Sequence, residues 1–195
     1  IKRGVLATGQ TIGCGAMRCP TLRDVDEFCG DARFGIIDEG GHRGKEVVEW
    51  VKQKKGWWTY KGDSSVRELD GWKRSANRKK LILANPYQFQ GELLSLMYLQ
   101  DNPEAADFWG LPDAMRGYPD DYIAQVTALQ PNQRKRHGHE YRNWSNGDRA
   151  DHYFDAEKML LVVLRVAAKY SPGWNPPEWV RPQKLRRKPR FRRMS

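Results

Sequence analysis

The sequence has no hydrophobic segment long enough to cross a membrane. Its longest uninterrupted apolar run, residues 159–164, falls far short of the roughly 20 residues that a membrane-spanning helix requires. No signal peptide opens the chain either, and its first residue is Ile1. We therefore expect no membrane contact, and we expect the chain to be a fragment or a processed product.

Cysteine is scarce as well. The three cysteines, Cys14, Cys19 and Cys29, are an odd number at irregular spacing and form no CxxC pair. A disulfide framework and a structural zinc site both require other patterns. These residues are expected to be reduced thiols in a cytosolic setting.

Acidic residues are lacking at the end of the chain. Residues 181–195 contain no Asp or Glu but eight of the 34 Lys and Arg residues, which leaves 26 basic against 24 acidic residues elsewhere. Such a segment cannot bury a core, so we expect a flexible basic tail over residues 173–195. Lys and Arg side chains that bind nucleic acid phosphates release counterions, so we expect a polyanion as the partner of this tail. The alternative is a solubilising tail without a fixed partner. The tail residues expected to bind DNA are Arg186, Arg187, Lys188, Arg190, Arg192 and Arg193.

Two shorter basic clusters precede the tail, and for each of them a solvated loop is the alternative. They are Lys73, Arg74, Arg78, Lys79 and Lys80, and then Arg134, Lys135 and Arg136. Together with the tail they predict an electrostatic surface for nucleic acid.

The chain does have enough apolar and aromatic material for a core. Hydrophobic residues make up 39% of the 195 residues, and the aromatic ones comprise eight Trp, eight Tyr and six Phe. This composition excludes a wholly disordered chain and predicts one compact domain over residues 1–172.

The order of the apolar segments predicts an α/β domain. Residues 34–37 have the pattern of a buried strand, residues 45–55 that of an amphipathic helix, and residues 57–60 that of a second strand. This order indicates a βαβ unit in a parallel sheet. Residues 151–170 are apolar on nearly all sides, so we expect a long helix that packs centrally. The other expected elements are strands at 4–12 and 81–83, helices at 24–29 and 90–99, a strand or short helix at 122–129 and a polar loop at 132–149.

Three acids and one histidine stand where chemistry is expected. Asp38 follows the buried strand, and ligand sites of open α/β sheets gather at the carboxyl ends of strands. Asp151, His152 and Asp155 open the long helix, and their spacing places Asp155 on one face with the other two. Carboxylates grouped in this way suit Mg²⁺ or Mn²⁺. The alternative is structural: Asp38 and Asp151 cap helices, and Asp155 complements the positive helix end.

The order of these motifs resembles a known family. The run FGIIDEGGH at residues 34–42, followed by EV at 46–47 and YKG at 60–62, is similar to the nuclease domain of tailed-phage large terminase subunits, most of all in the lambda-like branch. The run DHYFDA at residues 151–156 resembles the motif that opens the last helix of that domain, and Trp144 also fits. The resemblance covers roughly residues 5–170 and depends on the order and spacing of short motifs.

This resemblance implies a ribonuclease-H-like fold with a mixed central sheet, flanking helices and a long central C-terminal helix. It implies a metal-dependent endonuclease that cuts concatemeric viral DNA during packaging, in the cytoplasm of the infected host cell. Asp38 and Asp155 match catalytic acids, with His152 beside Asp155, and the implied metal ligands are Asp38, Asp151 and Asp155. In two-metal hydrolysis one Mg²⁺ or Mn²⁺ ion activates water and the other stabilises the departing 3′ oxygen.

The implied substrate is double-stranded DNA, and the implied partners are a terminase ATPase part, the small terminase subunit and the portal. The sequence has no counterpart of the family's opening strand, which carries the first catalytic acid. It also lacks the ATPase run GxxxxGK[ST]. After the third strand, where the family often has a Lys, this chain has Gln90. A second polypeptide that supplies the missing strand is one expectation, and an impaired copy is another.

Three other functions remain as alternatives. One is a non-catalytic DNA-binding module, and another is a scaffold piece that docks onto a partner through an unpaired sheet edge. A restriction-type nuclease is disfavoured because residues 57–61 contain no acid–x–Lys pair.

Overall fold

The computed structural model describes residues 2–5, 11–98, 109–110, 118–136, 139–171, 174, 176 and 178–180. Only the backbone is described for residues 2–5, 11–12, 98, 131–136, 139–143 and 178. Within these residues, no helix is both long enough and apolar enough to cross a membrane.

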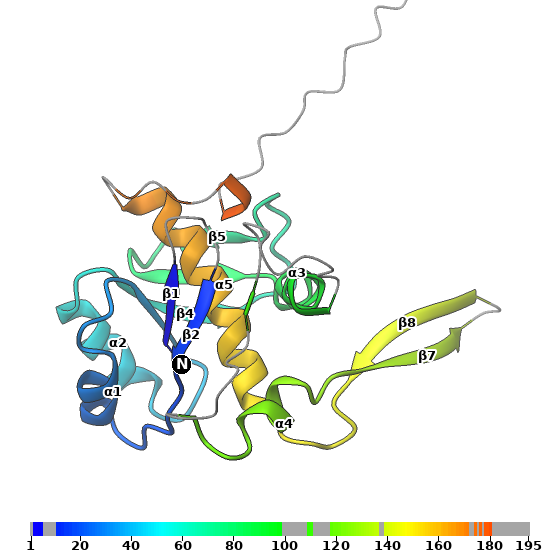
Figure 1. Ribbon diagram of the computed structural model, residues 1–195. Coiled ribbons are helices and arrows are strands. Elements are labelled where there is room, and N and C mark those ends of the chain that lie inside the picture. Colours follow the sequence, from blue (N-terminus) through cyan, green and yellow to red (C-terminus); the bar gives the residue numbers. More distant parts are fainter. Residues whose placement is uncertain are drawn as a thin grey trace, which may run out of the picture.

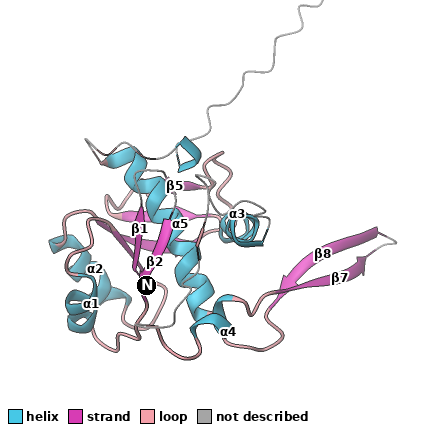
Figure 2. Cartoon of the chain, in the orientation of Figure 1, coloured by secondary structure: helices cyan, strands magenta, loops and turns pink. Residues whose placement is uncertain are grey.

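A four-stranded mixed sheet forms the centre of the fold (Figures 1 and 2). Three strands run parallel, namely β3 (Gly35–Asp38), β4 (Trp57–Gly62) and β6 (Leu81–Ala84), and β5 (Trp72–Arg74) runs antiparallel beside β6. The order across the sheet is β3-β4-β6-β5, so β3 and β5 are its edges. The predicted α/β class, the mixed sheet and the βαβ unit of residues 34–60 are therefore confirmed, with α2 (Gly44–Gln53) as the crossover helix.

Helices cover both faces of this sheet. Tyr60, Ile82 and Ala84 point to one face, where they form the main core with α3 (Pro86–Tyr98) and α5 (His152–Tyr170). The opposite face packs against α2, where the Trp50 and Trp57 rings meet edge to face with centroids 5.0 Å apart. Gly35 is required beneath Trp57, because a Cβ at Gly35 would lie 2.3 Å from the Trp57 ring.

The last long helix, α5, passes through the middle of the molecule (Figure 1). Its buried residues include Phe154, Leu161, Val162 and Val166, each at most 1% exposed. The prediction of a long, central, C-terminal helix is confirmed, because apolar residues on nearly all sides leave few orientations in which the helix avoids water.

The N-terminal segments also contribute elements. The strand predicted at residues 4–12 is observed as two antiparallel strands, β1 (Lys2–Val5) and β2 (Thr11–Gly15), and residues 6–10 lie outside the described residues. Helix α1 (Leu22–Cys29) contains the predicted helical residues and begins at a capping box between Thr21 and Asp24.

The prediction of a polar loop at residues 132–149 was wrong. Strands β7 (Gln130–Arg136) and β8 (His139–Ser145) pair antiparallel there and project from the rest of the molecule (Figures 1 and 2). Because most residues of both strands are polar, the sequence lacks the alternation that marks a strand with one buried face. The undecided segment before it forms a short helix, α4 (Tyr122–Val126).

The described chain ends in a short 3₁₀ turn, η1 (Glu178–Val180). Val180 is fully buried and Trp179 packs against the main core. Residues 181–195, with the six tail residues expected to bind DNA, lie outside the described residues.

Candidate functional site

Asp38 ends β3 at the carboxyl edge of the parallel strands. Its side chain is exposed, and its Oδ1 accepts a hydrogen bond of 2.9 Å from the backbone N–H of Gly40. This local bond fixes the orientation of the carboxylate at the sheet edge and does not use Oδ2. Asp38 does not cap α2, because the N-cap position of that helix is Arg43.

Gly40 keeps the space beside this carboxylate clear. A Cβ at Gly40 would lie 3.2 Å from Asp38 Oδ1 and 3.5 Å from Oδ2. At Gly41, the next residue, a Cβ would meet nothing within 4 Å. The glycine at position 40 therefore provides room for a group that approaches the Asp38 carboxylate.

Tyr60 connects Asp38 with the long helix. It lies opposite Asp38 in the β3–β4 register and is only 6% exposed. Burial raises the pKa of Tyr60 to about 12, and the negative charges of Asp38 and then Asp155 contribute to the same shift. Asp38 is thus the register neighbour of Tyr60, and the charge of Asp155 on α5 also contributes to the raised pKa of this phenol.

Asp155 is held by a lysine one turn later on α5. Lys158 Nζ lies 2.5 Å from Asp155 Oδ1, and the Lys158 side chain is 11% exposed while that of Asp155 is 53% exposed. A largely buried ammonium group therefore orients a carboxylate that remains accessible. Neither Tyr60 nor Lys158 was singled out from the sequence, although the i,i+3 spacing of Asp155 and Lys158 is a usable signal.

The other two predicted site residues stand at the start of α5. Asp151 occupies the N-cap position, but its side chain makes no capping hydrogen bond, and only its carbonyl accepts from the Asp155 N–H, at 3.0 Å. His152 is exposed as the first helical residue. The Asp151 side chain therefore does not cap α5, which was the structural alternative for this residue.

The described residues supply few metal ligands in one place. Among them, no group of three or more His, Cys, Asp or Glu side chains is arranged to hold a metal ion. Mg²⁺ is usually bound by one or two carboxylates and completes its shell with water and substrate phosphate, so Asp38 and Asp155 each offer the type of ligand that this ion prefers.

The basic residues of the first cluster have different surroundings. Arg78 forms a two-pronged pair with Glu39, with N–O distances of 2.6 and 2.5 Å. Lys80 Nζ donates to the carbonyls of Val51, at 2.7 Å, and Lys54, at the C-terminal end of α2. Lys79 is exposed. The cluster predicted as one surface is thus divided between an ion pair, a helix cap and solvent.

The two remaining members of that cluster lie on the edge strand β5. Lys73 Nζ is 3.8 Å from Glu68 Oε1, and the Arg74 guanidinium lies 5.5 Å from the centre of the Tyr170 ring. Arg134, Lys135 and Arg136 belong to β7, where only the backbone is described.

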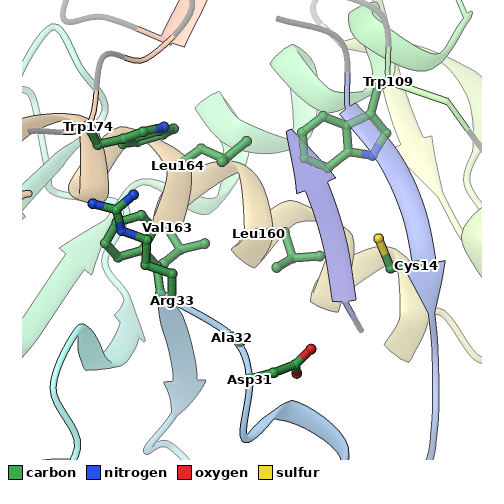
Figure 3. Close-up of a pocket in the computed structure, with 10 residues that line it drawn as sticks. Cys14, Asp31, Ala32, Arg33, Trp109, Leu160, Val163, Leu164 and Trp174 are labelled. Atoms are coloured by element: carbon green, nitrogen blue, oxygen red, sulfur yellow. The ribbon is translucent and has the colours of Figure 1, made fainter. Parts of the chain in front are cut away.

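Two largely apolar cavities lie beside β3, which is an edge strand of the described sheet. One has a volume of about 370 Å³ and lies between β2, α5 and the segment before β3 (Figure 3). Its lining includes Cys14, Phe34, Trp109, Leu160 and Trp174. A second cavity of about 210 Å³ shares Phe34 and Leu160 with the first and reaches the β3 residues 35–37.

Comparison with known proteins supplies one match. The family model described as "Terminase large subunit gpA, endonuclease domain" matches residues 31–174, which include Asp38, Asp151, His152 and Asp155. No curated protein and no solved structure matches the chain.

Proposed function

The chain belongs to the family of terminase large subunit gpA endonuclease domains, and on this premise we propose that it is a metal-dependent endonuclease that cuts concatemeric viral DNA during genome packaging. The observation that supports this proposal most directly is the common effect of Asp38 and Asp155 on Tyr60. It supports an arrangement in which an acid at a strand end and an acid at a helix start bind the same cation, as phosphodiester hydrolysis by divalent cations requires.

The residues of this site have distinct tasks in the proposed reaction. Asp38 and Asp155 hold a divalent cation, Mg²⁺ or Mn²⁺, with Lys158 fixing the orientation of the Asp155 carboxylate. Gly40 leaves space at Asp38 for a water molecule or a phosphate oxygen. A bound cation would supply Lewis-acid activation of water and stabilisation of charge on the departing oxygen. His152, exposed one turn before Asp155, is placed to exchange protons with solvent.

A two-metal mechanism needs more ligands than this pair. Asp151 is our candidate for a third carboxylate, because its side chain is not used as a helix cap. We expect a further acid to come from a strand that another polypeptide adds to the free edge of β3. Two observations favour this arrangement: β3 is an edge strand, and apolar cavities run along it.

The fold family, the cellular location and the protein partners are proposed from the family alone. A ribonuclease-H-like fold, the cytoplasm of an infected bacterium, and contacts with a terminase ATPase part, the small subunit and the portal remain predictions. The same holds for DNA binding by the cluster at residues 73–80, by the tail, and by Arg134 and Arg136 of the second cluster, whose third member, Lys135, occupies the other face of β7. Among the described members of the first cluster, Lys79 is the best placed for DNA, because Lys80 and Arg78 have protein partners.

The proposal is tested by cleavage of a supercoiled plasmid in the presence of Mg²⁺, Mn²⁺ or EDTA. Asp38→Asn and Asp155→Asn remove one negative charge each without changing side-chain size. We expect cleavage to require a divalent cation and to fall at least about a hundredfold in both variants. Glu49→Gln is the matched control, because Glu49 is exposed on α2 and, among the described residues, pairs with Lys52, and this variant should cleave like the wild-type protein.

Two outcomes would contradict the proposal. Cleavage that continues in EDTA, or that survives both aspartate substitutions, would place the reaction elsewhere. A wild-type chain that binds the plasmid but never cuts it, even with the other terminase components added, would favour the non-catalytic DNA-binding module. Cleavage that begins only when those components are added would instead support completion of the site by a partner strand.

A further inference from the structure

The hairpin of β7 and β8 is built as a free-standing two-stranded ribbon. Its register is continuous over seven residue pairs, from Gln130 opposite Ser145 to Arg136 opposite His139. Within the described residues neither strand pairs with any other strand. Figure 1 shows the ribbon extending away from the sheet and from α5, and beyond its base no other described helix or strand runs beside it.

The base of the ribbon is fixed to the domain. Ala128 and Leu129, directly before β7, are 0% and 6% exposed, and Trp144 near the end of β8 packs against the main core. Arg149 donates to the carbonyl of Ala128, which joins the segment after β8 to the segment before β7. The ribbon is therefore anchored at one end and projects in a defined direction.

The register divides the ribbon into two faces with different residues. Directly opposed residues of an antiparallel pair share a face, and successive residues alternate between faces. The first face, here called the Arg134 face and taken beyond the Gln130–Ser145 pair at its base, carries Asn132, Arg134, Arg136, His139, Tyr141 and Asn143. The second, the Lys135 face, carries Pro131, Gln133, Lys135, Glu140, Arg142 and Trp144.

The two faces differ in their suitability for DNA. The Arg134 face has no acid, and all six of its residues carry hydrogen-bonding groups, with Arg and Asn as the types that recognise guanine and adenine edges. The Lys135 face places Glu140 directly opposite Lys135, and its Trp144 belongs to the anchored base. An uninterrupted row of donors therefore exists on one face only.

We propose that the ribbon lies in the major groove of duplex DNA with its Arg134 face toward the bases and phosphates. The major groove is about 12 Å wide and admits a two-stranded ribbon, whose strands are about 4.8 Å apart. Seven residues per strand give the ribbon a length of roughly 23 Å, which is enough to enter a groove about 8.5 Å deep.

This inference rests on the proposed function, since it assigns the groove contact of the same DNA substrate. The ribbon's second strand ends at Ser145 and α5 begins at His152, so the ribbon leaves the domain at the end of α5 that carries Asp155. A duplex gripped by the ribbon would extend from the acids along the projecting strands. The ribbon would then set the position of the duplex relative to the cleavage site.

The experiment compares two double variants of the full chain that lose the same charge. Arg134→Gln with Arg136→Gln changes the Arg134 face, and Lys135→Gln with Arg142→Gln changes the Lys135 face. Affinity for a short fluorescent DNA duplex is measured by anisotropy in EDTA at several salt concentrations. We expect the first variant to bind at least about tenfold more weakly, with a salt dependence reduced by about two counterions, and the second to bind within about threefold of the wild-type protein.

Competition identifies the groove. Methyl green, which occupies the major groove, should displace the wild-type protein, whereas the minor-groove ligand distamycin should not. Equal losses in the two double variants would mean that only net charge matters, and unchanged affinity in both would mean that the ribbon contacts something other than DNA. Either result, or displacement by distamycin alone, overturns the proposal. Because EDTA prevents metal-dependent cleavage, none of these outcomes depends on whether the chain is a nuclease.

Discussion

Asp38 and Tyr60 stand directly opposite each other on the parallel strands β3 and β4, and Asp155 of α5 acts on the same phenol. The three residues come from three elements, and Asp38 and Tyr60 lie at the carboxyl end of β3 and near that of β4. Tyr60 is therefore a built-in reporter of the two carboxylates, and its titration tests whether they converge.

Removing either carboxylate should lower the pKa of Tyr60. Asp38→Asn and Asp155→Asn each take away a negative charge that disfavours the phenolate, so the pKa should move down from about 12 in both variants. The tyrosine Cζ chemical shift, followed by NMR against pH, measures this directly. A shift in only one of the variants would mean that the acids do not share a site.

The same group should make the protein sensitive to alkali. The unfolded chain loses the tyrosine proton near pH 10, whereas folded Tyr60 keeps it up to about pH 12. Because the folded state then binds more protons, the free energy of unfolding falls as pH rises through this window, by at most roughly 3 kcal/mol in total. In Tyr60→Phe this part of the loss should disappear, as urea unfolding at pH 8 and at higher pH would detect. If the free energy of unfolding depends on pH in the same way in the wild-type protein and in Tyr60→Phe, this expectation is contradicted.

Neighbouring glycines after β3 offer a matched test of the space at Asp38. Gly40→Ala should reduce cleavage by about tenfold to a hundredfold, because its Cβ would stand 3.2 Å from Asp38 Oδ1 and displace the carboxylate. Gly41→Ala should cleave normally, because nothing lies within 4 Å of the added methyl group. Initial rates at saturating Mn²⁺, with thermal unfolding as a folding control, distinguish the two. Equal rates would show that this space is not used.

Lys80 and its neighbour Lys79 should differ in what they contribute. Lys80→Met should lower the free energy of unfolding by about 1–2 kcal/mol, because the ammonium group caps carbonyls at the end of α2. DNA affinity should hardly change. Lys79→Met should leave stability unaltered and weaken DNA binding in a salt-dependent manner. Chemical denaturation and anisotropy on both variants check this pair, and the reverse pattern would restore Lys80 to the DNA-binding surface.

Glu157 should contribute to the stability of the fold. It is fully buried on α5, and its carboxylate accepts from Trp109 Nε1 at 3.1 Å and from the Tyr122 hydroxyl at 2.5 Å. Glu157→Ala should cost about 3 kcal/mol or more, because both donors lose this acceptor and a cavity forms. Tyr122→Phe removes only one of these bonds and should cost less. Urea denaturation measures both values, and a loss below about 1 kcal/mol in Glu157→Ala would contradict the role.

Much of the architecture could be predicted from local patterns. The βαβ unit and the α5 helix were foreseen, because residues 45–55 have helical apolar spacing, the flanking strands are short apolar or aromatic runs, and residues 151–170 form a long stretch that is apolar on nearly all sides. The edge strand β5 was not expected, since its three residues, Trp72 to Arg74, include two cations and pair only because β6 lies beside them. The β7–β8 ribbon was missed for a related reason, because polar strands without a buried face leave no periodic signal.

The sequence by itself determined the chemistry that is available: an acid at the end of a buried strand, a second acid at the start of a central helix, and an excess of cations. Only the tertiary structure decided how these residues are used. It set Asp38 beside Tyr60, gave Lys80 to the end of α2, and divided Arg134 and Arg136 from Lys135 by strand alternation. The physical reason is that side-chain type is local, whereas proximity between segments far apart in the chain, and the face a residue occupies, depend on pairing partners that no short window contains.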